Sequence, residues 1–496
     1  MPANTSPVRV RFAPSPTGLL HIGGLRTALT NYLFARRNGG TFILRIEDTD
    51  RARFVEDAES DILESLSWAG IDVDASPQKG GEDGPYRQSE RSESYSRAAS
   101  ILVESGYAYT AFDTSEEIEE LRARHRSESN PNPRYDLNTR LEMKNSLSLS
   151  AEETRVRLER GDQHVIRLKV EPGQTLTFTD LIRGDVEFQS ETIDDQILVK
   201  SDGLPTYHLA NVVDDHAMQI THVIRGEEWL PSTPKHILLY QAFGWDPPVM
   251  AHLPLILSPT GGKLSKRSAE RAGIPVSVRD YIEADYEPEA VVNFLALLGW
   301  NPGSEEEFFT LGELIGAFSF DRVGQAGVQF DLNKLKWFNE HYLRAKPAAE
   351  LVSRAQIELD KAGIQYETDR LEDIINLMRD RISFVKDLTE STYLFCDPDE
   401  FDERAVSKRW KEDSAGLVAA YADRIGALED FSVEALEETL RSLAEENEIG
   451  AGQIIHPVRL AISGISHGAG LFDLLHVLGK VTCVRRMQHA AKVLGR

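Results

Sequence analysis

Residues 8–46 constrain the fold more than any other part of the chain, because they hold two strand patterns separated by one helix pattern. Residues 8–12 alternate as in a strand, and the turn-forming sequence PSPTG at 14–18 ends that pattern. Apolar residues then recur at helical spacing from Leu25 to Leu33, and a second strand pattern follows at 41–46. Because parallel strands need such a crossover helix between them, we expect the first βαβ unit of a doubly wound α/β sheet.

The alternation of strands and helices is interrupted and then resumes. A helical stretch from Arg91 ends at Gly106, and segment 107–204 changes to a polar run followed by strand-like pieces. We expect that segment to be an inserted α+β domain between two halves of the sheet. The second half is predicted from a strand at 220–224, a helix at 232–243 and a strand at 255–257.

From Ser277 to the end helical periodicity dominates, which predicts an all-α C-terminal half. The formal net charge of −25 argues against a generally basic nucleic-acid binder, so RNA binding would need local positive patches. Residues 451–496 are one candidate patch, although a basic chain end can also serve solubility alone. Its basic residues are Arg459, Lys480, Arg485, Arg486, Lys492 and Arg496, against the single acid Asp473.

No segment predicts a membrane span or a secretory signal. The most apolar stretch, Val291–Trp300, is too short to cross a bilayer, and residues 1–14 lack the apolar core of a signal peptide. Cys396 and Cys483 lie far apart and have neither metal-binding spacing nor a disulfide framework. We therefore expect a cytoplasmic protein with no membrane partner and no bound structural metal.

The turn after the first strand has features of a nucleotide site. The sequence PSPTGLLHIGG at 14–24 places His21 and two glycines at the entry of the first helix. Free N–H groups and the helix dipole favour phosphate there, and a glycine lets a flat base approach the backbone. His21 can donate a hydrogen bond to an oxygen that gains charge during a reaction. Alternatively, this is an ordinary glycine turn with a surface histidine.

A second candidate follows the last predicted strand of the sheet. Two lysines, Lys263 and Lys266, are three residues apart on a loop that begins with Gly261 and Gly262. Such lysines can hold the phosphates of ATP as pyrophosphate departs. The loop is not a P-loop, because Leu257 occupies the place of the required first glycine and Leu264 that of the Ser/Thr. Alternatively, it is a solvated run of charge.

Taken together, the two segments resemble the signature pair of class I aminoacyl-tRNA synthetases, and the rest of the chain resembles the bacterial glutamyl-tRNA synthetases over essentially its whole length. The signature pair differs from the general class I form at two positions, where Gly24 replaces a histidine and Leu264 a methionine. Both replacements are typical of the glutamyl-tRNA synthetases. The resemblance is carried by RIEDTD at 45–50, GPYRQS at 84–89, PTYHLANVVDDH at 205–216, IRGEEW at 224–229, PVRLAISG at 457–464 and GLF at 470–472.

The resemblance implies a split Rossmann-type catalytic domain with an inserted α+β domain, followed by an all-α C-terminal half. The expected parts are the first catalytic half at 1–106, an insertion that binds the acceptor end at 107–204, the second catalytic half at 205–262, the lysine loop with a helical stem-contact domain at 263–344, and an all-helical anticodon-binding region at 345–496 with a subdomain boundary near 405.

The resemblance also assigns site residues. His21, Lys263 and Lys266 are the expected catalytic residues. Two arginines suit the carboxylate of a glutamate side chain, and Glu47 suits its α-amino group. Without the family resemblance, we would interpret Arg11 as a polar residue at the edge of a strand and Arg225 as an ion-pair partner of Glu227 or Glu228. The expected ATP-binding residues are Gly18, His21, Gly23, Trp229, Lys263, Ser265 and Lys266, and the expected glutamate-binding residues are Arg11, Ser15, Glu47, Tyr207, Asn211 and Arg225.

The implied reaction activates L-glutamate with ATP and Mg²⁺ to glutamyl-adenylate, and then transfers it to the terminal adenosine of tRNA(Glu). Some relatives bind zinc through cysteines in the insertion, and because Ala111, Asp113 and Thr139 stand at the matching positions we predict no structural zinc. A monomer is the family expectation. Enzymes that charge glutamine, or both tRNAs, are the near alternatives, and a small-molecule nucleotidyltransferase and a non-catalytic RNA-binding protein are the more distant ones.

Arg381 is the candidate anticodon residue. It lies near the centre of an apolar helical stripe, where a charge needs a partner or must reach solvent. The stripe is formed by Ile374, Leu377, Met378, Ile382 and Val385. One interpretation is a structural pair with an acid such as Asp387. The resemblance implies instead that Arg381 reads the third anticodon base and favours glutamate tRNA over glutamine tRNA.

Overall fold

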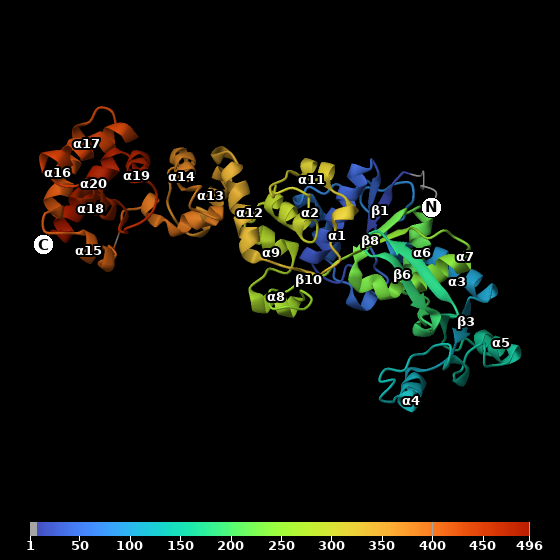
Figure 1. Ribbon diagram of the computed structural model, residues 1–496. Helices are drawn as coiled ribbons and strands as arrows, with labels where there is room; N and C mark the ends of the chain where they lie inside the picture. The colour runs from blue at the N-terminus through green and yellow to red at the C-terminus, as the bar shows by residue number, and fades with distance from the viewer. Residues whose placement is uncertain (1–6, 399, 496) are drawn as a thin grey trace. The chain divides into compact units, whose positions relative to one another are not determined.

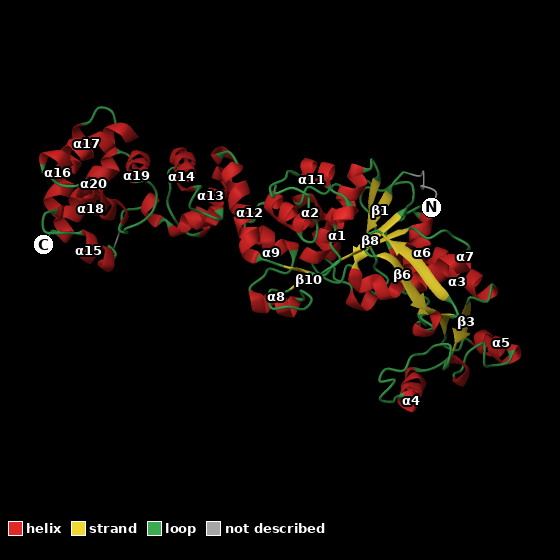
Figure 2. Ribbon diagram, in the orientation of Figure 1, coloured by secondary structure: helices red, strands yellow, loops and turns green. Residues whose placement is uncertain are grey.

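The computed structural model describes residues 7–398 and 400–495, and it divides into two compact units (Figure 1). The first unit extends to Ala284 and also contains Val291–Leu332. The second contains Asp285–Ala290 and the chain from Asn333 onward. Within the described residues every strand belongs to the first unit, and the second is helical (Figure 2).

The expected βαβ unit is present at the start of the chain. Strand β1 (Arg9–Phe12) pairs in parallel with β2 (Thr41–Leu44), and α1 (Ile22–Arg37) forms the crossover. Helix α1 begins after the loop at 14–20 because His21 caps it, its Nδ1 accepting from Gly23 N at 3.0 Å. The apolar residues of α1 are buried against the sheet, as their helical spacing predicted.

The second half of the sheet lies beside the first. The N–H of Thr221 donates to Arg9 O at 2.9 Å, which joins β8 (His222–Gly226) to β1, and β8 pairs in parallel with β9 (Val249–Leu253). Because these strands are parallel, their carboxyl ends meet at one edge of the sheet. The helices of the two halves are α2 (Ala58–Trp68), α3 (Ser92–Glu104), α6 (Tyr207–Ala217) and α7 (Thr233–Phe243).

The inserted segment contains a small antiparallel sheet and a hairpin. The sheet has the order β3-β4-β7, whereas the hairpin β5–β6 pairs with β9 of the parallel sheet through Asp180 and Met250. The insertion is therefore not separate from the sheet that it interrupts. Its elements are β3 (Ala108–Ala111), α4 (Ser115–His125), α5 (Ala151–Arg160), β4 (Val165–Leu168), β5 (Thr175–Asp180), β6 (Gly184–Gln189) and β7 (Ile197–Val199).

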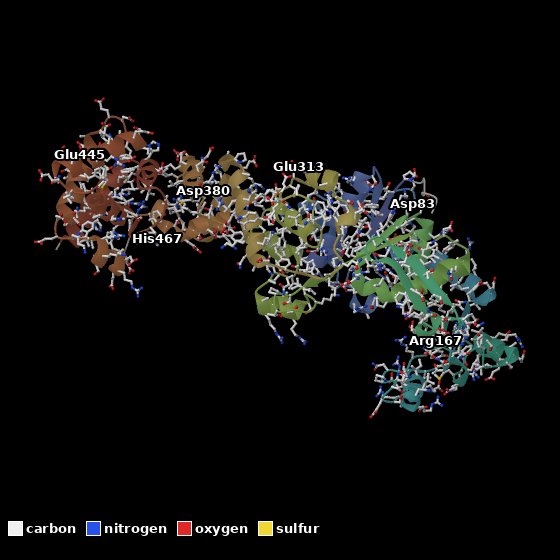
Figure 3. The ribbon with its side chains drawn as sticks, in the orientation of Figure 1. Asp83, Arg167, Glu313, Asp380, Glu445 and His467 are labelled. Atoms are coloured by element: carbon white, nitrogen blue, oxygen red, sulfur yellow. The ribbon has the colours of Figure 1, made fainter. Side chains whose placement is uncertain are left out.

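The positions compared with zinc ligands have other contacts. Ala111 is buried in β3, and Asp113 accepts from Tyr135 OH at 2.8 Å and from Lys144 N at 2.6 Å. Thr139 Oγ1 donates to Arg134 O at 2.9 Å. Arg167, labelled in Figure 3, lies in this segment with its guanidinium carbon 3.9 Å from the centre of the Tyr135 ring. The absence of a zinc ion stays a prediction.

One strand interrupts the stretch that was expected to be helical from Ser277 onward. Strand β10 (Ile256–Leu257) pairs in parallel with β11 (Val328–Gln329). The helical expectation is confirmed apart from this short break, which had no signal in the sequence because a two-residue strand is fixed by a distant partner and leaves no periodic pattern of its own. The helices that follow β10 in the sequence are α8 (Lys266–Ala272), α9 (Val278–Glu283), α10 (Pro288–Leu297), α11 (Leu311–Ala317) and α12 (Leu332–Ala345).

The second unit consists of helices around its own apolar core. Arg486, counted above in the basic patch, is instead buried, and its guanidinium donates to the carbonyls of Tyr393, Ile462 and Cys396. The patch is weaker than its sequence suggests. The remaining helices are α13 (Ala348–Lys361), α14 (Leu371–Met378), α15 (Glu403–Arg409), α16 (Ser414–Ala427), α17 (Val433–Glu446), α18 (Gly452–Ser463), α19 (Leu471–Leu478) and α20 (Lys480–Leu494).

Across the described residues, none of the helices combines the length and the apolar character needed to cross a membrane.

Candidate active site

A cavity of about 990 Å³ lies at the carboxyl edge of the parallel sheet. Its walls come from the segments that follow β1, β2, β8 and β9, and from the lysine loop. The fold therefore brings all the residues predicted for ATP and glutamate to one place. They are Arg11, Ser15, Gly18, His21, Gly23, Glu47, Tyr207, Asn211, Arg225, Trp229, Lys263, Ser265 and Lys266.

His21 is held in one chemical form at the start of α1. Because its Nδ1 accepts from Gly23 N, the proton of the neutral ring lies on Nε2, which can donate. Burial, with a further contribution from Lys263, lowers the pKa of His21 below its ordinary value. Gly18 has φ of +155°, which a side chain would rarely tolerate, so the turn before His21 depends on this glycine.

The two signature segments are tied together by the backbone. Ile22 N donates to Val276 O at 3.0 Å, and Val278 N donates to Leu20 O at 2.8 Å. The chain that leaves the lysine loop therefore forms a short bridge with the chain around His21. This places the imidazole and the loop on the same cavity, although they are more than two hundred residues apart in sequence.

The lysine loop is exposed, and one of its lysines has an acidic partner. Lys263 Nζ lies 3.1 Å from Glu228 Oε1, and both side chains are about half exposed. Lys266 is the first residue of α8, and Ser265 caps that helix by accepting from Ser268 N at 3.3 Å. Ser265 therefore has a structural role in addition to the predicted one. Lys266 has no ion-pair partner among the residues that the structure describes.

Buried charges surround the inner end of the cavity. Arg11 donates to both oxygens of Asp215, at 3.0 and 3.2 Å, and Arg45 donates to Asp215 at 2.7 Å and to Glu47 at 3.1 Å. Burial would raise the pKa of Asp215, but Arg11 and Arg45 outweigh it, so the pKa lies below its ordinary value. Burial raises the pKa of Glu47 despite the same two arginines. In the described part of the chain Arg11 Nη1 has no hydrogen-bond partner, so it can serve a ligand.

Asn211 and Asp214 complete this cluster. The side-chain amide of Asn211 fits its neighbours when its oxygen and nitrogen are exchanged. The nitrogen then donates to Asp215, and the oxygen accepts from Arg11 and Arg45. Asp214 accepts from Arg91 Nε at 2.6 Å and from Tyr95 OH at 2.8 Å. Two adjacent acids on one helix are thus both buried and both paired with arginine.

Arg225, at the end of β8, is a buried cation with neutral neighbours. Its side chain donates to His252 Nε2 at 3.1 Å, to Tyr207 OH at 2.9 Å and to Thr233 Oγ1 at 2.8 Å. No carboxylate of the described chain lies within ion-pair distance of it. The suggested pairing with Glu227 or Glu228 does not occur, because Glu227 pairs with Arg183 and Glu228 with Lys263.

The contacts of Arg225 leave room for a ligand. Its two longest contacts are from Nη1 to His236 Nδ1 at 3.3 Å and from Nη2 to Trp229 O at 3.4 Å. One of them lies on each terminal nitrogen, so a carboxylate that replaced both would bind end-on with two charge-assisted hydrogen bonds. Trp229 itself is 40% exposed, and its ring lies 4.3 Å from the Tyr207 ring.

Arg381 lies in the second unit, and the prediction of its surroundings was wrong in one respect. Helix α14 ends at Met378, so Arg381 is not on a continuous helix with Ile382. The turn exposes its side chain, and Nε donates to Gly468 O at 3.3 Å. Asp387 is not its partner, because that carboxylate accepts from Ser383 N and Phe384 N. An anticodon role for Arg381 stays a prediction.

Several residues of the site were not assigned from the sequence. Arg45 and Asp215 lie inside the segments that carry the family resemblance, and two adjacent acids on a largely apolar helix were a signal that both are paired in the interior. His236 and His252 contact Arg225, and Asp180 contacts His252, and none of the three lines the cavity. No local pattern around these residues indicated this arrangement.

Comparison with known proteins gives a consistent result. Residues 7–337 match the family described as tRNA synthetases class I (E and Q), catalytic domain, and residues 344–491 match an anticodon binding domain. The glutamate–tRNA ligase of Bacteroides fragilis is 48% identical, with 98% of this chain and 99% of that protein covered. That of Cytophaga hutchinsonii is 46% identical, with 97% of each chain covered. A crystal structure of a glutamate tRNA ligase from Elizabethkingia meningosepticum in complex with its amino acid has 42% identity and a TM-score of 0.94, and the match covers 99% of this chain and 100% of that one.

Proposed function

This chain belongs to the class I tRNA synthetases for glutamate and glutamine and is a glutamate–tRNA ligase, and we propose that the cavity at the carboxyl edge of its sheet is where glutamate and ATP react. The observation that carries the assignment of the cavity is Arg225. A buried guanidinium with only neutral partners is costly unless a ligand supplies the negative charge.

Glutamate recognition divides between the two ends of the substrate. Arg225 and Tyr207 receive the side-chain carboxylate, and this is supported by the end-on approach that the long contacts of Arg225 permit. Glu47 accepts from the α-amino group. Because burial raises the pKa of Glu47, a bound ammonium would stabilise its ionised form. Arg11 contributes Nη1, while Ser15 and Asn211 shape the inner wall.

ATP lies toward the two signature segments. Gly18 and Gly23 let the nucleotide approach the backbone, Trp229 borders the adenine, and His21 donates from Nε2 to a phosphate oxygen. Lys263 and Lys266 hold the departing pyrophosphate. The cavity carboxylates Glu47, Asp50 and Glu228 already pair with Arg45, Arg53 and Lys263, so Mg²⁺ would arrive on the ATP phosphates, where it shares their charge. Positioning of the substrates and electrostatic stabilisation are then enough to accelerate adenylate formation, and no side-chain nucleophile is required.

The second step takes place on tRNA. The terminal adenosine hydroxyl attacks the glutamyl carbonyl, and AMP leaves. We propose that the insertion at 107–204 receives the acceptor end and that the region at 345–496 reads the anticodon, with Arg381 favouring glutamate tRNA. We further propose a cytoplasmic monomer without structural zinc, in which glutamate activation requires bound tRNA.

Pyrophosphate exchange tests these assignments. The full chain is assayed with glutamate and with glutamine, each with and without tRNA(Glu). We expect exchange with glutamate, a far weaker rate with glutamine, and neither rate when tRNA is absent. A glutamine rate equal to or above the glutamate rate would show that the cavity does not select a carboxylate, and exchange without tRNA would show that glutamate activation does not depend on tRNA. Charging of tRNA(Gln) with glutamate would identify an enzyme that serves both tRNAs.

A further inference from the structure

Two residues that do not line the cavity form a hydrogen-bonded chain that ends on Arg225. Asp180 and His252 are fully buried, at 1% and 0% exposure, and they are linked by a contact of 2.6 Å between Asp180 Oδ2 and His252 Nδ1. Asp180 ends strand β5 of the inserted segment, and His252 lies on β9 of the catalytic sheet. The same two strands pair in parallel at Asp180 and Met250, so the backbone fixes this contact.

The hydrogen bonds determine which ring nitrogen of His252 carries the proton. Arg225 Nε can only donate, and it lies 3.1 Å from His252 Nε2, so Nε2 must be an acceptor. The proton is then on Nδ1, where the Asp180 carboxylate accepts it. Burial is the main cause that lowers the pKa of His252, which keeps the ring neutral.

This arrangement leaves the two terminal nitrogens of Arg225 on the side where a ligand can bind. Because Nε of Arg225 donates to His252, the terminal nitrogens Nη1 and Nη2 project away from that hydrogen bond. These two nitrogens make the long contacts, to His236 and Trp229, that a ligand can replace. A guanidinium that lost its Nε anchor could rotate and lose the end-on geometry that a carboxylate requires.

We propose that Asp180 and His252 are positioning residues for substrate recognition: Asp180 fixes the tautomer of His252, and His252 aims Arg225 at the side-chain carboxylate of glutamate. A residue of the insertion thus sets the selectivity of a pocket in the catalytic sheet. This inference rests on the proposed function of the cavity and on the role given to Arg225.

The substitution Asp180→Asn tests the tautomer without changing the shape of the side chain. Asp180 Oδ1 accepts from Ile182 N at 2.9 Å and from Arg183 N at 3.0 Å, so an asparagine would keep its oxygen there and turn its NH₂ toward His252. That amide would donate to Nδ1 and move the ring proton to Nε2, where it would face the N–H of Arg225. In Ser-His-Asp triads the same replacement imposes the wrong tautomer.

The experiment measures tRNA-dependent pyrophosphate exchange by the full-length enzyme. Asp180→Asn should raise KM for glutamate at least about tenfold and leave KM for ATP within about twofold, and the weak glutamine rate should change little. His252→Gln is the conservative variant, because its side-chain oxygen can still accept from Arg225, and its KM for glutamate should rise less than that of Asp180→Asn. Arg36→Gln, which lies outside the cavity, is the control and should leave both KM values unchanged. A purely structural role would instead change both KM values together.

A spectroscopic readout keeps the proposal testable even if activity is lost. Long-range ¹H–¹⁵N correlation spectra of histidine-labelled enzyme should show the Nδ1–H form of His252, identified by its disappearance in His252→Gln. A wild-type ring in the Nε2–H form would overturn the proposal. An Asp180→Asn enzyme with unchanged KM for glutamate would also overturn it, whereas an Arg225→Gln enzyme with unchanged KM would overturn the underlying role of Arg225.

Discussion

The carboxylate of Asp215 holds the guanidinium of Arg11 through two hydrogen bonds, from Nε at 3.0 Å and from Nη2 at 3.2 Å. Its Oδ1 also accepts from Arg45 at 2.7 Å, so one buried acid supports two arginines. Nε and Nη2 of Arg11 are therefore occupied by Asp215, and among the described residues only Nη1 has no partner and is left for a ligand. The same residues offer Arg225 no such acid, so the two arginines are not interchangeable in recognition.

Replacing Asp215 with asparagine should destabilise the protein strongly. The change leaves Arg11 and Arg45 buried without the negative charge that they share. Removing one partner of a buried ion pair lowers the free energy of unfolding by about 3–5 kcal/mol. We expect a loss of that size in the free energy of unfolding from urea denaturation. Asp162→Asn, which breaks a surface pair with Arg160, should have little effect. Equal stability of the Asp215 variant and wild type would contradict the paired cluster.

Replacing Arg225 with glutamine should remove the preference for glutamate. A carboxylate brought into the cavity would then be unpaired, at a cost of about 2–5 kcal/mol in kcat/KM. The glutamine rate should change much less, and pyrophosphate exchange with both amino acids measures the split. Arg36→Gln removes a guanidinium that pairs with Asp74 outside the cavity, and it should leave both rates unchanged. An equal loss for both amino acids would place Arg225 in folding or in ATP binding.

Lys266→Ala should slow adenylate formation while glutamate and tRNA still bind. Loss of one donor to transition-state charge costs about 3–4 kcal/mol, or roughly 10²–10³ in rate. Single-turnover measurement of adenylate separates this step from binding. The neighbouring Arg267 is also exposed but does not line the cavity, so Arg267→Ala is the matched control and should be near wild type. Near wild-type activation by Lys266→Ala would refute the assignment.

Arg381→Gln should alter tRNA choice and leave stability unchanged. Within the part of the chain that the structure describes, the exposed guanidinium has one hydrogen bond, to Gly468 O, so the fold depends on it little. Charging of a tRNA with a CUG anticodon should rise relative to the CUC form. The control is Arg379→Gln, which removes the same charge two residues away. If the Arg381 variant melts earlier and the tRNA ratio is constant, Arg381 is structural.

His222 should make stability depend on pH in a defined window. Burial lowers the pKa of His222 from its ordinary 6.5 to about 4. Between those values the unfolded chain binds a proton that the folded chain does not, so the free energy of unfolding falls as pH falls. His222→Gln should therefore lose less stability than wild type between about pH 7 and pH 4.5. His467→Gln changes an exposed imidazole (Figure 3) and should follow wild type. Parallel curves for all three proteins would contradict the burial effect.

The sequence by itself determined the local elements and the identity of the two signature segments. The strand–turn–helix–strand pattern at 8–46 depends on periodicity and on turn residues, which act over a few positions, and the structure has the same elements within a few residues. The catalytic and binding residues were chosen by chemistry and by family resemblance, and the fold brings those of the first unit to one cavity.

Only the tertiary structure decided which charges compensate one another. Arg11 and Asp215 are 204 residues apart, and Asp180 and His252 are 72 apart, so no local pattern connects them. The same applies to β11, whose partner is distant, and to Arg381, where an apolar stripe continued in the sequence after the helix had ended. The free energy of a buried charge depends on its neighbours in space, and these are fixed only when the parallel strands bring their carboxyl ends together.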